Sequence, residues 1–121
     1  MKKFIGIFMV ISGVLMIGMW LFFLLTGKVP ELGSAPWTTM AHISAELCTG
    51  SLMILGGFRI IKMKQNAERI ALFALGFYIY AVIQAFGYYL QQGLFFFVVM
   101  FTVFFVLGIL SVSILVRSNL E

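Results

Sequence analysis

Residues 37–62 form the stretch that decides the fold, WTTMAHISAELCTGSLMILGGFRIIK. A helix needs about 20 mostly apolar residues to cross a membrane, and this stretch is long enough. His42 and Glu46 lie four residues apart within it and therefore share one helix face. They are the only histidine and the only carboxylate that stand inside apolar sequence. We therefore expect a membrane helix that carries a polar face.

The composition places the whole chain in a membrane. Hydrophobic residues make up 63% of the 121 residues and charged residues 10%, whereas soluble domains are about one quarter charged. The length allows one domain, residues 1–121. The net charge of +4 does not indicate a nucleic-acid partner, because the basic residues cluster at the ends of apolar segments.

Three more apolar segments accompany the first, which predicts an all-α, up-down antiparallel bundle of four transmembrane helices. The predicted spans are about 4–26, 37–61, 68–90 and 94–116. A cleaved signal peptide would have an apolar region of roughly 7–15 residues, and the first span is longer. We expect helix ends at Gly27 and at the turn 91–93, a loop over 27–36 with Pro36 opening the second helix, and caps from Ser34 and Asn66.

The charge distribution predicts the orientation. Seven basic residues fall on one side of the predicted bundle: Lys2, Lys3, Arg59, Lys62, Lys64, Arg69 and Arg117. Lys28 alone falls on the other side, so the positive-inside rule places both termini in the cytoplasm. Four aromatic residues then fall near the outer interface: Trp20, Trp37, Tyr88 and Tyr89. We expect a multi-pass protein of a prokaryotic inner or plasma membrane.

The second and third spans are joined by a short turn, so residues at equal depth can be paired. The pairs are Glu46 with Gln84, His42 with Tyr88, Gly50 with Tyr80, and Gly57 with Phe73. We infer a polar pocket between these two helices, in the outer half of the bilayer. Its candidate ligand-binding residues are His42, Glu46, Thr49, Tyr80, Gln84 and Tyr88.

A charged side chain at the bilayer centre costs about 2.5–3.5 kcal/mol on insertion scales, so we expect Glu46 to face the bundle, protonated or hydrogen-bonded. The alternative is that these polar residues only hold helices together, with bonds worth about 0.6 kcal/mol each. Cys48 is rotated about 200° from Glu46 on a helix. His42 and Glu46 alone are too few ligands for a closed metal site, so we predict no metal and no cofactor.

Residues 41–50, AHISAELCTG, resemble a pattern in small, uncharacterised four-span prokaryotic membrane proteins. In those proteins a His-x3-Glu-x2-Thr pattern punctuates the second helix, and the resemblance implies a fold but no activity. The small multidrug-resistance transporters are similar in length, but their essential glutamate lies in the first helix.

The favoured function is a non-enzymatic membrane protein that binds or transports a small amphipathic or lipid-like ligand, with Glu46 as its polar anchor. One alternative is a membrane enzyme that uses His42 and Glu46 as an acid–base pair on a lipid-soluble substrate. A structural subunit of a larger membrane complex is another. Membrane lipids are the expected surroundings, and the small interior leaves a homo-oligomer open.

Overall fold

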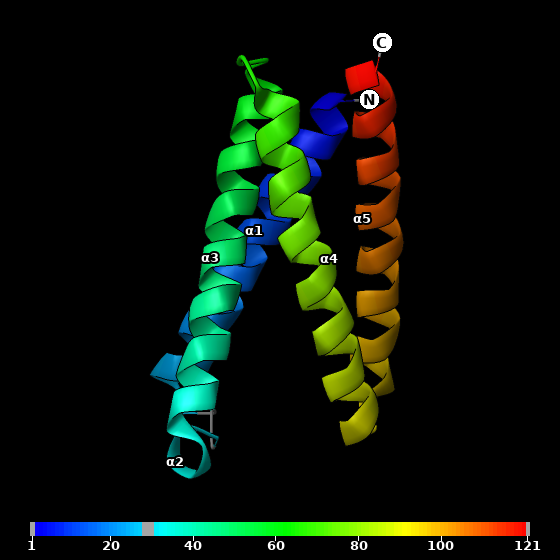
Figure 1. The fold of residues 1–121 in the computed structure, drawn as a ribbon. Coiled ribbons are helices and arrows are strands. Elements are labelled where there is room, and N and C mark those ends of the chain that lie inside the picture. The colour runs from blue at the N-terminus through cyan, green and yellow to red at the C-terminus, as the bar shows by residue number, and fades with distance from the viewer. Residues whose placement is uncertain (1, 28–30, 121) are drawn as a thin grey trace.

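The computed structural model describes residues 2–27 and 31–120 and is all-α over them. Four of its helices are long and apolar enough to cross a membrane, as predicted, and their bounds lie within a few residues of the predicted spans. The elements are α1 (Lys2–Leu25), α2 (Glu31–Ser34), α3 (Pro36–Ile61), α4 (Ala67–Gln92) and α5 (Phe95–Leu120) (Figure 1). Lys28 and Glu121 lie outside the described residues.

Some of the helix ends match those predicted from the sequence, and others do not. Gly27 and Gly93 take left-handed conformations, with φ of 68° and 73°, and Pro36 stands in the first turn of α3, as predicted. Asn66 is the N-cap residue of α4, as predicted, although its side chain makes no cap hydrogen bond. The predicted cap from Ser34 is wrong, because Ala35 is the N-cap residue of α3. Ser34 instead ends α2, a one-turn helix inside the predicted loop. Asn66 is itself left-handed, with φ 62°, which asparagine tolerates better than most residues.

The four long helices associate as two pairs, α1 with α3 and α4 with α5. Helices α3 and α4 meet beside the turn that joins them and diverge toward their other ends (Figure 1). Both chain termini lie at the end where the helices meet, which we call the closed end. The opposite end, which carries α2 and the α4–α5 turn, is called the open end.

Glycines bring α1 and α3 into backbone contact. A Cβ added to Gly13 would lie 2.5 Å from the Gly50 carbonyl oxygen, and one added to Gly57 would lie 2.6 Å from the Gly6 carbonyl oxygen. Seven-residue spacing on both helices keeps these pairs in register, as small residues do in tightly packed membrane helices. Gly50 and Gly57, which the depth pairing set opposite Tyr80 and Phe73 of α4, therefore face α1 instead.

The core lies where α1, α3 and α4 meet, toward the closed end. Its fully buried side chains include Met9, Met53, Leu75 and Tyr78, and Gly56 brings α3 close to the backbone of Ala71. Small residues on α4 allow this approach, whereas no residue of α4 after Val82 is buried among those described.

Two polar contacts close this end of the molecule. The Lys2 ammonium donates to the Glu68 carboxylate at 2.8 Å and so ties the start of α1 to the first turn of α4. The Arg59 guanidinium donates to the Gln65 carbonyl oxygen at 3.0 Å, across the turn between α3 and α4. The start of α4 is therefore held from two sides.

Candidate functional site

Glu46 and His42 form the centre of the candidate site. Both side chains project from α3, one helical turn apart, and the His42 Nε2 to Glu46 Oε1 distance is 3.5 Å. Glu46 is buried at 8% exposure, as predicted for an ionisable group in a membrane helix, whereas the His42 side chain is 40% exposed. A distance of 3.5 Å is long for a hydrogen bond. Among the described residues no hydrogen bond reaches Glu46, so its carboxyl group keeps most of its bonding capacity.

Trp20 of α1 completes this cluster. Its indole ring meets the edge of the His42 ring at a centroid distance of 5.7 Å and an interplanar angle of 75°. The Trp20 Nε1 atom is buried and has no hydrogen-bond partner among the described residues. The ring, which we predicted to lie near the outer interface, packs against α3. The cluster therefore combines an acid, an imidazole and an unused N–H donor.

The nearby polar residues of α3, Thr49 and Cys48, do not contribute free donors to this cluster. Thr49 is 2% exposed, and its hydroxyl donates to the Ala45 carbonyl oxygen at 2.8 Å. This bond leaves Thr49 no hydrogen to donate to a ligand in this rotamer. Cys48 is exposed on another side of the helix, as the spacing predicted. Across the described residues, no group of three or more His, Cys, Asp or Glu side chains could hold a metal ion.

The predicted partners on α4 do not join this cluster. The Gln84 side-chain amide donates to the Tyr80 hydroxyl at 3.0 Å, and both residues are exposed. Gln84 lies two residues after the buried Val82, and Tyr80 lies two residues after the buried Tyr78. Two residues turn the helix by about 200°, so this pair points away from the buried side. Tyr88 is 49% exposed and packs against the edge of Tyr89. The predicted shared face of the two helices is therefore wrong, because α4 turns its small residues toward α3 and its polar pair away.

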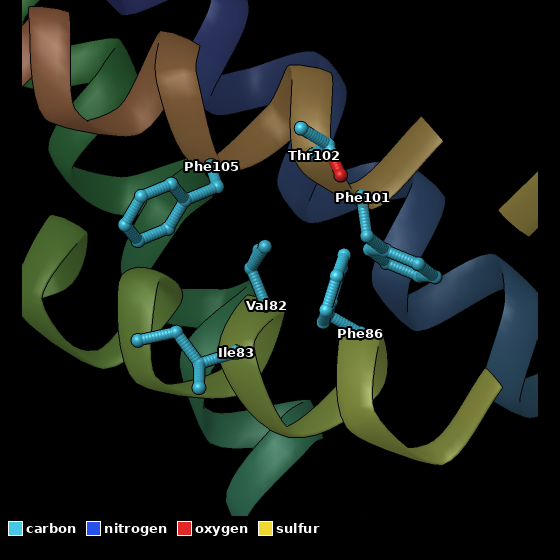
Figure 2. A pocket seen from close by; sticks show the side chains of 6 residues that line it. All are labelled: Val82, Ile83, Phe86, Phe101, Thr102 and Phe105. Atoms are coloured by element: carbon cyan, nitrogen blue, oxygen red, sulfur yellow. The ribbon is translucent and has the colours of Figure 1, made fainter. Parts of the chain in front are cut away.

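A pocket lies instead between α4 and α5 (Figure 2). Its volume is about 290 Å³, and three side chains of each helix surround it: Val82, Ile83, Phe86, Phe101, Thr102 and Phe105. The Thr102 hydroxyl donates to the Val98 carbonyl oxygen of its own helix, so the lining is essentially apolar. The pocket suits a hydrocarbon or aromatic group.

Tyr89 of α4 packs against one wall of this pocket. Its ring stacks on Phe101 at a centroid distance of 5.5 Å and on Phe97 at 4.7 Å. Neither Tyr89 nor Phe101 was predicted as a site residue. The aromatic residues repeated along the last span were the available signal in the sequence.

Residues 1–121 match a protein family described as a domain of unknown function, DUF8058. The chain belongs to this family. No curated protein and no solved structure matches it. The family description assigns no activity, so the chemistry of the site must carry the functional argument.

Proposed function

We propose that this chain binds a small amphipathic or lipid-like ligand within the membrane and that Glu46 anchors the ligand's polar group. The observation that carries this proposal is the buried Glu46 carboxyl group, whose described contact is a single long approach from His42. A buried acid is costly unless its bonding capacity is used, and a ligand would use it.

The cluster specifies the polar group that would fit. Glu46 can accept a hydrogen bond from an O–H or N–H group, and Trp20 can donate one from Nε1. A ligand that carries a hydroxyl or amine together with an oxygen acceptor satisfies both residues. The half-exposed His42 side chain lies between them and can either donate or accept.

The pocket between α4 and α5 supplies a place for the apolar part. We assign it this role because its lining is essentially apolar and one of its walls, Phe101, is held in place by stacking on Tyr89. Thr49 would contribute its oxygen as an acceptor.

Native mass spectrometry of the protein purified in mild detergent tests the proposal. The wild type should carry a bound small mass, which Glu46→Gln should lose. Glu68→Gln is the matched control, because Glu68 is also a glutamate but lies at the closed end, where it pairs with Lys2. Trp20→Phe should retain less of the mass than the wild type. A wild type with no bound mass, or equal occupancy in Glu46→Gln, contradicts the proposal.

We also propose that the closed end faces the cytoplasm, because the turn between α3 and α4 carries Arg59, Lys62 and Lys64. In a Cys48→Ser background, a Gln65→Cys variant should react with a membrane-impermeant thiol reagent only when the cytoplasmic side is open. Reaction in intact cells would reverse the orientation.

A further inference from the structure

The side of α4 opposite the core is an exposed face with its own chemistry. We define the α4 outer face as Phe73, Gly76, Phe77, Tyr80, Gln84 and Gly87. Phe73 is 60% exposed and Tyr80 is 65% exposed. A Cβ added to Gly76 or Gly87 would meet nothing within 4 Å. None of these residues is needed to pack the chain's own helices.

The polar pair on this face is the feature that calls for a partner. Tyr80 and Gln84 lie near the middle of α4, within the hydrocarbon of any bilayer that the helix crosses. Their one mutual bond uses a Gln84 N–H and the Tyr80 oxygen. It leaves the Tyr80 hydroxyl hydrogen and the Gln84 side-chain carbonyl without partners among the described residues. Polar groups exposed to lipid are unfavourable, because lipid tails offer no hydrogen bonds.

The leftover groups complement each other. The Tyr80 hydroxyl is a donor and the Gln84 carbonyl is an acceptor, so two copies of this face satisfy one another. A two-fold axis along the membrane normal makes the contacts reciprocal: each Tyr80 donates to the Gln84 of the second copy. A partner of other chemistry would need its own matching pair, whereas a second copy supplies one by symmetry.

The rest of the face fits the same arrangement. Gly76 lies one turn before Tyr80, and Gly87 lies about one turn after Gln84, so small residues flank the polar pair on both sides. Glycines at such positions let two membrane helices approach closely. The Phe73 and Phe77 rings, 5.0 Å apart, stand beside Gly76 and can cover the second copy's glycine. We propose that the protein forms a two-fold homodimer through the α4 outer face.

The dimerisation equilibrium in vesicles tests this proposal. The wild type, labelled with donor and acceptor dyes at its C-terminus, should show energy transfer that falls as the lipid-to-protein ratio rises. A Tyr80→Phe/Gln84→Leu double variant should dimerise about tenfold more weakly, as expected for losing two membrane hydrogen bonds. Ser113→Ala is the matched control, because the exposed Ser113 hydroxyl bonds only the Ile109 carbonyl of its own helix among the described residues.

Cysteine cross-linking locates the interface independently. In a Cys48→Ser background, Gly76→Cys or Gly87→Cys should form disulfide-linked dimers under mild oxidation. Leu110→Cys, on the exposed side of α5, should not. Energy transfer no higher than for a dilute monomer, equal dimerisation of the double variant, or equal cross-linking through Leu110→Cys would each overturn the proposal. Glu46→Gln should leave dimerisation intact, which separates this test from that of ligand binding.

Discussion

The two helix pairs of this molecule are built by opposite means. Helices α1 and α3 meet through glycines, so that their backbones touch at Gly13 and Gly57. Helices α4 and α5 meet through rings, with Tyr89 stacked on Phe97 and Phe101, and a pocket of about 290 Å³ remains between them. Small residues thus let two helices pack without a gap, whereas large rings leave space between their helices.

The largest effect is expected when a large residue is placed in the glycine interface between α1 and α3. Gly13→Leu should destabilise the protein by about 3 kcal/mol or prevent folding, because overpacking here forces two backbones apart. Denaturant unfolding in mixed micelles measures the change. Gly18→Leu on the same helix is the control, since a Cβ at Gly18 meets nothing within 4 Å. Equal losses in the two variants would show that the α1–α3 interface is not close-packed.

Removing a ring tests the other pair. Phe101→Ala should destabilise the protein by about 2–3 kcal/mol, somewhat less than truncation of a phenylalanine in a soluble core, because one side already faces a pocket. The variant should also lose bound ligand. Phe96→Ala removes a ring that is 76% exposed and should change stability by less than about 0.5 kcal/mol. If the Phe96 variant is the less stable one, the stack on Tyr89 does not hold α4 and α5 together.

The four spans could be predicted from the sequence because length and hydropathy depend only on local composition. The helix stops at Gly27 and Gly93 were predictable for a similar local reason. Which helices pack against one another could not be predicted from the sequence in the same way. We assumed that α3 would turn its polar face toward α4, but the paired glycines direct much of the buried face of α3 toward α1. The same limit applies to the site. Glu46 and His42 could be predicted from their charge within apolar sequence, whereas Trp20 could not, because its contact with His42 joins two segments distant in the sequence.

The two helix pairs are joined at the closed end by the ion pair of Lys2 with Glu68. Glu68→Gln should cost no more than about 1 kcal/mol, because both side chains are partly exposed and such pairs contribute little. The loss should shrink at high salt, which screens exposed charges. Unfolding at low and high ionic strength measures both effects. A loss that salt leaves unchanged would mean that Glu68 acts through packing and not through its charge.

The smallest effect is expected at a second contact between the pairs, between Tyr78 and Phe8. Tyr78 of α4 is buried beside α1, where its ring meets the edge of Phe8 at 5.7 Å. Its hydroxyl is directed toward Ser12 but makes no hydrogen bond of ordinary geometry among the described residues. Tyr78→Phe keeps the ring contact and removes a hydroxyl that gains little, so stability should change by less than about 0.5 kcal/mol.

Phe8→Ala provides the contrast, because it removes the ring and keeps the Tyr78 hydroxyl. It should cost more than Tyr78→Phe in the same unfolding measurement, since packing, and not a polar bond, then joins α1 to α4. A loss above about 1.5 kcal/mol in Tyr78→Phe would reverse this assignment. The hydroxyl would then bond Ser12 in the membrane, and the helix pairs would be held by one polar contact at mid-depth as well as by the ion pair at the closed end.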